Sequence, residues 1–229
     1  MATERAHEAP PGRPGVEATI EQLGRIGVVP VVEIPDVAMA IPLADALLEA
    51  GVGTVEITFR TAAGGEALAA IRQQRPELLA GAGTVLRPDQ LETAVTAGAR
   101  FIMSPGFSPS IVEAAMAAGV PVIPGVATST EVQRALETGL EVLKLFPAEP
   151  LGGVGYLKAL GAPFPDVRFV PTGGVNAANA ASYLELSNVL AIGGSWFVSK
   201  AWLAEGDYEA IRRHAAEAVA IVARVRGTG

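Results

Sequence analysis

One lysine in this sequence lies inside an apolar segment where its amine could act as a nucleophile. Lys144 belongs to the run VLKLF, residues 142–146, whose pattern predicts a β-strand. Alternation along a strand puts Val142, Lys144 and Phe146 on one face and the two leucines on the other. Burial penalises the charged ammonium, which favours the neutral amine that forms Schiff bases with carbonyl compounds. The alternative is a lysine that only pairs with a buried carboxylate.

A second strand-like run carries polar residues at every other position. In VEITFR, residues 55–60, Glu56, Thr58 and Arg60 share one face, and apolar residues occupy the other. A glutamate can act as a general acid or base, and a guanidinium matches the geometry of a carboxylate. The alternative is a buried Glu–Arg pair that only supports packing.

Two glycine pairs occur late in the chain, at the ends of the last two predicted strands. They are Gly173–Gly174, after Thr172, and Gly193–Gly194, before Ser195. Glycines let backbone N–H groups approach an anion, and a helix that follows adds a favourable dipole. Together the two turns predict a site for phosphate or another anion. The earlier run GAGT, residues 81–84, is equally consistent with a close-packing turn.

Composition narrows the chemistry further. The 229 residues are 50% hydrophobic and 18% charged, enough for a packed core, and the net charge of −7 argues against nucleic acid or an anionic membrane as partner. The chain has no cysteine and only two histidines, His7 and His214, so thiolate nucleophiles are excluded and His-ligated metal sites are disfavoured. We expect no metal or other cofactor. Residues 1–15 lack the apolar core of a signal peptide, and we expect a cytoplasmic protein.

The elements that position these residues follow one repeated pattern. Apolar β-branched runs begin near Val28, Gly53, Leu79, Arg100, Pro121, Glu141, Val167 and Val189. Their period of about 23 residues suits eight βα units. The sequence thus predicts an α/β fold, a single (β/α)8 TIM barrel over residues 16–229, after a disordered tail at 1–15.

Two helices complete the predicted barrel, an extra N-terminal one at about Val16–Arg25 and a final one at Tyr208–Arg226. Barrel active sites lie at the C-terminal ends of the strands, where the polar residues above are expected. An open doubly wound sheet is the alternative, but it needs a glycine-rich turn after its first strand. Here that strand ends in EIPD, residues 33–36, without a glycine.

Local signals mark several helix starts. Pro88 and Pro109 stand where first helical turns are predicted, and Thr128 with Glu131 has the spacing of a capping box. Asn176 is a candidate N-cap for the helix that follows it.

Six segments in this order resemble one enzyme family. They are VEITFRT (55–61), GAGTV (81–85), SPG (104–106), LKLFPAE (143–149), PTGGV (171–175) and IGGSW (192–196). They are similar to 2-keto-3-deoxy-6-phosphogluconate (KDPG) aldolase, a family that includes 4-hydroxy-2-oxoglutarate (KHG) aldolase activity. The resemblance runs from about Val28 to Tyr208. It implies a metal-independent class I aldolase on a (β/α)8 barrel, which cleaves KDPG to pyruvate and glyceraldehyde 3-phosphate, and usually a homotrimer.

The resemblance also implies roles for individual residues. Lys144 resembles the Schiff-base lysine, and Glu56 resembles the general acid/base. The positions similar to binders of the pyruvate carboxylate are Arg60 and Thr84, and those similar to the pocket walls are Pro105 and Phe146. The positions similar to groups around the distal substrate end and its phosphate are Thr172, Gly173, Gly174, Gly194 and Ser195.

One position departs from the family pattern. Some members carry an arginine near the end of the first strand, whereas this chain has Glu33, which alternation places on the lumen face with Val29 and Val31. An unpaired carboxylate there would repel an anionic substrate.

Three kinds of alternative function stay open from the sequence. The same chemistry could act on the KHG substrate, giving glyoxylate, or on the 6-phosphogalactonate epimer. A phosphosugar isomerase or epimerase would need the late glycine turns but not Lys144. A non-catalytic barrel that serves as a binding or assembly module would tolerate substitution of Lys144 and Glu56 with its oligomer intact.

Overall fold

The computed structural model describes residues 14–227, in which short parallel strands alternate with helices. The strands are β1 (Val28–Val32), β2 (Thr54–Thr58), β3 (Leu79–Gly83), β4 (Ile102–Met103), β5 (Val122–Ile123), β6 (Gly125–Val126), β7 (Val142–Leu145), β8 (Arg168–Phe169) and β9 (Ile192–Gly194). The α-helices are α1 (Pro14–Ile26), α2 (Ala40–Glu49), α3 (Gly64–Gln74), α4 (Pro88–Thr96), α5 (Pro109–Ala117), α6 (Ser129–Glu137), α7 (Gly153–Gly161), α8 (Ala180–Leu184), α9 (Lys200–Glu205) and α10 (Tyr208–Arg226). Two 3-10 turns are η1 (Val37–Met39) and η2 (Glu149–Leu151).

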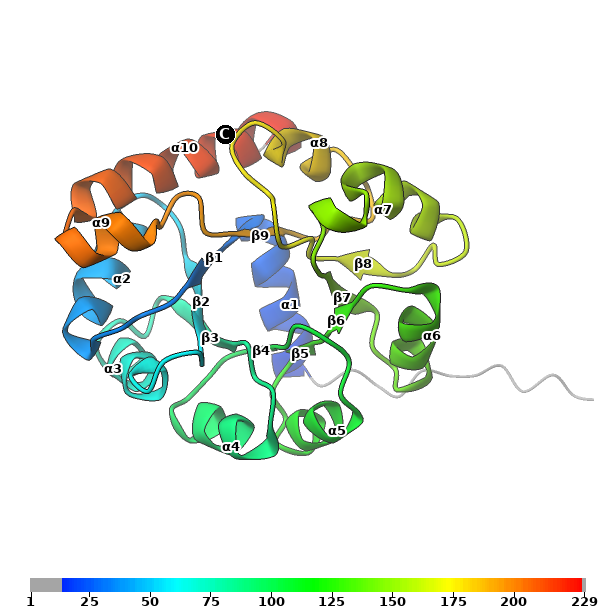
Figure 1. Ribbon diagram of the computed structural model, residues 1–229, viewed down its shortest axis with the longest axis horizontal. Coiled ribbons are helices and arrows are strands. Elements are labelled where there is room, and N and C mark those ends of the chain that lie inside the picture. Colours follow the sequence, from blue (N-terminus) through cyan, green and yellow to red (C-terminus); the bar gives the residue numbers. More distant parts are fainter. Residues whose placement is uncertain (1–13, 228–229) are drawn as a thin grey trace, which may run out of the picture.

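The strands curl around a centre, and α2 to α10 lie outside them (Figure 1). Every pairing between these strands is parallel. The strand order is β5-β4-β3-β2-β1-β9 in one sheet and β6-β7-β8 in the other. The α/β fold with a curled parallel sheet is therefore confirmed.

The sequence predicts one continuous eight-stranded sheet, but the strands of residues 14–227 form two separate sheets. The run predicted from Pro121 is split into β5 and β6 around Pro124, which has no N–H to donate to a strand ladder. Between the β8 and β9 segments, two isolated bridges join the described residues, Phe169 with Val189 and Thr172 with Gly193.

Apolar residues fill two separate volumes. The larger core lies between the strands and the outer helices. The smaller cluster lies inside the curl and comprises Leu23, Val29, Leu79, Phe101, Met103, Ile123, Val142, Val170, Leu190 and Ala191. Leu23 comes from α1, which crosses behind the strands in Figure 1 and covers one end of the curl. That end of the interior is apolar and closed.

Most helix boundaries agree with the sequence signals. Pro88 and Pro109 begin α4 and α5, and Thr128 with Glu131 forms the capping box of α6. The Asn176 prediction was wrong, because α8 begins later, at Ala180 after Asn179. The Asn176 side chain instead accepts a hydrogen bond from the backbone of Ala178, and this local turn competes with the helix.

The predicted tail is only partly described. Residues 14 and 15 belong to α1 rather than to a tail, and residues 1–13 lie outside the described part. Among residues 14–227, no helix is both long enough and apolar enough to span a bilayer.

Candidate active site

A lysine and a glutamate meet inside the curled sheet. Lys144 Nζ on β7 lies 3.1 Å from Glu56 Oε1 and 3.4 Å from Oε2 on β2. The Glu56 side chain is fully buried, and the Lys144 side chain is 5% exposed. A buried pair of this kind is expensive to desolvate, and hydrogen bonding between its members offsets only part of that cost. Transfer of one proton from Nζ to the carboxylate would leave a neutral amine and a neutral acid in the same place.

Strand alternation explains why the two side chains meet. Leu143 and Leu145 pack in the larger core between the strands and the helices, so Val142 and Lys144 point to the inside of the curl. Val142 belongs to the inner cluster, and Lys144 Nζ lies 5.7 Å from the centre of the Phe146 ring. The predicted facing of this strand is therefore confirmed.

Space for the Glu56 carboxylate comes from a glycine on the neighbouring strand. A Cβ built on Gly83, in β3, would lie 2.1 Å from Glu56 Oε1. Any side chain at this position would displace the carboxylate or the strand. The run GAGT is thus mostly strand. Gly81 lies in the middle of β3, packed against Phe101, Gly83 ends the strand, and Thr84 lies beyond it.

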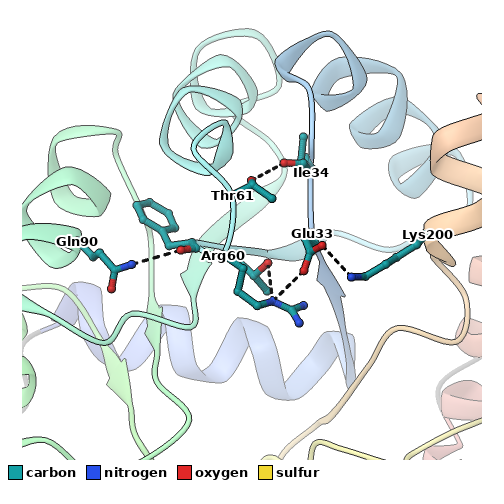
Figure 2. A network of polar contacts seen from close by, with 8 residues as sticks. Glu33, Ile34, Arg60, Thr61, Gln90 and Lys200 are labelled. Carbon is teal, nitrogen blue, oxygen red and sulfur yellow. Dashed lines mark hydrogen bonds and ion pairs between the residues drawn. The ribbon is translucent and has the colours of Figure 1, made fainter.

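Arg60 lies two residues beyond the end of β2, in a network of charges (Figure 2). Its Nε donates a hydrogen bond of 3.3 Å to Thr58 Oγ1 and lies 3.2 Å from Glu33 Oε2. Lys200 Nζ, at the start of α9, donates a bond of 2.7 Å to the other oxygen of Glu33. The pKa of the Glu33 carboxyl is held below its usual value, chiefly by the hydrogen bond from Lys200, with a further contribution from the charge of Arg60.

Two loops at the same ends of the strands carry the next predicted residues. Thr84, directly after β3, has a φ of 57°, the one left-handed non-glycine residue among residues 14–227. A β-branched residue in this conformation is strained, and such strain concentrates at functional sites. Pro105 follows β4, and a Cβ on Gly125 would lie 2.2 Å from its carbonyl oxygen. Close approach of these two backbones therefore fixes the Pro105 loop.

The two late glycine turns lie side by side. Thr172 forms a parallel bridge to Gly193, whose missing Cβ leaves room for the Thr172 hydroxyl. Gly173 and Gly174 have φ values of 97° and 87°, a region that glycine adopts readily. Within residues 14–227, the backbone N–H groups of Gly173, Gly174 and Ser195 make no hydrogen bond. They are donors that an anion could use.

Known proteins are similar to this chain over most of its length. The family model described as "Aldolase: KDPG and KHG aldolase" matches residues 19–214. The chain belongs to the KDPG and KHG aldolase family. A 2-dehydro-3-deoxy-phosphogluconate aldolase of Treponema pallidum is 48% identical over 202 residues, covering 88% of this chain and 96% of the relative.

Two solved aldolases have the same fold. The KDPG aldolase of Legionella pneumophila, with pyruvate captured as a covalent carbinolamine intermediate, matches with a TM-score of 0.83 at 38% identity, covering 90% of this chain and 97% of that one. The KDPG aldolase of Zymomonas mobilis with 3-phosphoglycerate matches with a TM-score of 0.82 at 39% identity, over 88% and 95% of the two chains. Aldolases of this family are carbon–carbon lyases.

In this aldolase the structure brings the predicted residues to one end of the curled sheet. Lys144 Nζ lies beside both Glu56 and the Phe146 ring, and the loops that carry Arg60 and Thr84 follow the adjacent strands β2 and β3. The glycine turns follow β8 and β9. Within the described residues, no cluster of three or more His, Cys, Asp or Glu side chains could hold a metal ion.

Sequence reasoning missed two residues that lie beside the candidate site. Gly83 was read only as part of an ambiguous turn, although glycines at alternate strand positions signal a close approach. Lys200 had no role assigned, and its partner Glu33 is 167 residues away in the sequence. No local pattern could have paired them.

Proposed function

We propose that this aldolase cleaves 2-dehydro-3-deoxy-6-phosphogluconate to pyruvate and glyceraldehyde 3-phosphate by a class I mechanism. The observation that carries the proposal is the buried contact of 3.1 Å between Lys144 Nζ and Glu56 Oε1. Burial removes competing water, and the carboxylate provides a base within reach of the amine.

Lys144 forms the covalent intermediate in this mechanism. Glu56 accepts a proton from Nζ, and the neutral amine attacks the C2 ketone of the 2-keto acid. The resulting carbinolamine takes one proton back from Glu56 and loses water, which leaves an iminium bond between C2 and Nζ. The Lys144–Glu56 contact supports this proton shuttle.

Glu56 then acts on the substrate. Its carboxylate removes the proton of the C4 hydroxyl, directly or through one water, and the C3–C4 bond breaks as the aldehyde forms. The electron pair moves to C3 and into the iminium, giving an enamine on Lys144. Glu56 returns the proton to C3, and water hydrolyses the restored iminium to pyruvate and the free amine.

The other residues bind the ends of the substrate. Arg60 and Thr84 hold the carboxylate next to the reacting ketone, and Pro105 and Phe146 form walls of the pocket. The strain at Thr84 and the free terminal nitrogens of Arg60 support this assignment.

The phosphate end of the substrate rests on the two late turns. Thr172 and the backbone of Gly173, Gly174, Gly194 and Ser195 surround it. The unbonded N–H groups of Gly173, Gly174 and Ser195 support the binding of an anion, because backbone donors suit phosphate oxygens.

KHG aldolase activity is the second candidate, with glyoxylate as the aldehyde product. The family model that this chain matches covers both KDPG and KHG aldolases, which supports this candidate. The 6-phosphogalactonate epimer differs from KDPG only in stereochemistry at C4. Initial rates with the three substrates would rank them.

We also propose a closed (β/α)8 barrel in one domain of residues 16–229, a homotrimer and a cytoplasmic location. The bridges Phe169–Val189 and Thr172–Gly193 support closure between the β8 and β9 segments. The trimer is supported by the resemblance to the KDPG and KHG aldolase family. Light scattering on the purified protein measures the number of chains.

Borohydride reduction with and without pyruvate tests the proposed mechanism, followed by peptide mass mapping. We expect a pyruvate-derived adduct on Lys144 and none on Lys158 or Lys200, and the three lysines of the chain make the map simple. A folded protein without an adduct would overturn the Schiff-base mechanism and favour an isomerase or a non-catalytic barrel.

A further inference from the structure

The proposed carboxylate-binding residue is a long side chain in an open position. The Arg60 side chain is 47% exposed. Immobilising such a side chain on a ligand costs conformational entropy, unless the protein already holds it in the binding geometry. The contacts of Arg60 in the free protein therefore decide how much of that cost remains.

Those contacts engage one edge of the guanidinium. Nε donates to Thr58 Oγ1 and lies 3.2 Å from Glu33 Oε2. Figure 2 shows the Arg60 side chain directed toward Glu33. The two terminal nitrogens form no hydrogen bond to any other residue in 14–227. They keep the pair of N–H donors with which arginine binds both oxygens of a carboxylate.

Glu33 is itself held in place. It directly follows β1, and its side chain is 23% exposed, against 71% for Lys200. The 2.7 Å bond from Lys200 Nζ uses Oε1 and leaves Oε2 for Arg60. One carboxylate thus joins the start of α9 to the end of β2, along the ends of the three neighbouring strands β9, β1 and β2.

We propose that Glu33, anchored by Lys200, is a positioning residue that holds the Arg60 guanidinium with its terminal nitrogens free for the substrate carboxylate. The inference rests on the proposed function, in which Arg60 binds that carboxylate. Glu33, which departs from the family pattern, would then have a role in substrate binding.

Charge alone predicts the opposite effect of removing Glu33. A carboxylate near the site repels an anionic substrate and offsets the charge of Arg60, so its loss would tighten pyruvate binding. If Glu33 positions Arg60, its loss weakens pyruvate binding instead. The sign of the change separates the two explanations.

The test measures borohydride trapping of pyruvate on Lys144 as a function of pyruvate concentration. We expect Glu33→Ala to raise the half-saturating pyruvate concentration about 3- to 5-fold, the range for a partly exposed ion pair. The trapping rate at saturating pyruvate stays within about 2-fold, because Lys144 and Glu56 are untouched. Glu33→Gln keeps an oxygen beside Nε and is expected to change half-saturation less than about 2-fold.

Lys200→Met tests the anchor. We expect a smaller rise than in Glu33→Ala, and a double variant no worse than Glu33→Ala alone, because Lys200 acts through Glu33. Matched controls are Lys158→Met and Glu113→Ala, an exposed lysine on α7 and an exposed glutamate on α5, which are expected to leave half-saturation unchanged. Far-ultraviolet circular dichroism verifies that each variant is folded.

Each outcome is decisive. Tighter or unchanged pyruvate binding in Glu33→Ala would overturn the inference, as would equal weakening in Glu33→Ala and Glu33→Gln. Fully additive effects of the Glu33 and Lys200 variants would overturn the anchoring by Lys200. Failure of the wild-type protein to form the adduct would instead overturn the proposed function.

Discussion

The two ends of the curled sheet are built from the same strands but differ in chemistry. Along β7, Val142 packs into the apolar inner cluster, whereas Lys144 two residues later forms an ion pair with Glu56. Along β1, Val29 is in the same cluster, and Glu33 at the strand's end belongs to a charge network. One end is optimised for packing, and the other holds costly buried charges.

Backbone groups show the same difference. At the polar end Thr84 has a strained left-handed φ, and the N–H groups of the late turns are unbonded. At the other end Arg226 donates hydrogen bonds to the carbonyls of Gly24, Val189 and Leu190, beside a cleft of about 400 Å³. An arginine there completes the backbone bonding, whereas Arg60 keeps donors free. Strain and unsatisfied donors therefore mark the end where we propose the chemistry.

Among the variants at the polar end, Lys144→Ala is expected to have the largest effect. We expect turnover to be abolished, because no other amine replaces the Schiff-base nucleophile. Aldol cleavage coupled to detection of pyruvate measures it. Lys158→Ala, on the exposed face of α7, serves as the control and is expected to be close to silent. Retained turnover in Lys144→Ala would contradict the mechanism.

Glu56→Gln removes the base but keeps the shape of the side chain. We expect kcat to fall by about 10²- to 10⁴-fold, the usual contribution of a positioned general base. Steady-state kinetics separate this from a binding role. A rise in KM with kcat unchanged would make Glu56 a binding residue.

Leu23→Ala removes packing from the apolar cluster at the other end of the curled sheet. Leu23 is fully buried in the inner cluster, so we expect the free energy of unfolding to fall by about 2–5 kcal/mol. Denaturant unfolding measures this, and kcat per folded molecule is expected to stay near the wild-type value. Leu86→Ala, at a residue 54% exposed, should change stability by less than about 0.5 kcal/mol. Loss of kcat in folded Leu23→Ala would show that the two ends are not independent.

The sequence predicts the facing of side chains where strands alternate. Lys144, Glu56 and Arg60 follow from a period of two, because the apolar residues between them must face the helices. Thr84 and Pro105 lie in loops beyond the strands, where no period applies, and only the family resemblance indicated them. Local patterns also do not show which distant strands pair, so the Glu33–Lys200 contact could not be predicted from the sequence. Proline at 124 had no visible consequence until the strand ladder was known.

A last comparison sets two arginine–carboxylate pairs against each other. Arg75 at the end of α3 binds Asp45 on α2 through two hydrogen bonds, one of 2.8 Å from Nη2 to Oδ2. Arg75 directs both Nε and Nη2 to a carboxylate of the protein, whereas Arg60 leaves its two terminal nitrogens free. The role of Arg75 is therefore to join two helices. The hydrogen bond from Arg75 holds the pKa of Asp45 below its usual 3.8.

Asp45→Asn should therefore affect stability and its pH dependence but not pyruvate binding. A lowered carboxyl pKa stabilises the folded state above the unfolded value and loses that effect as pH falls through the folded value. We expect Asp45→Asn to lower the free energy of unfolding by about 0.2–1 kcal/mol at pH 7, since both side chains are partly exposed. The difference from wild type should shrink as the pH drops below 3.8, because Asp45 then becomes protonated and nearly isosteric with asparagine. Urea unfolding at a series of pH values measures it. A difference that stays constant into acid would show that the charge of Asp45 contributes nothing to stability, and that the pair joining α2 and α3 acts through shape alone.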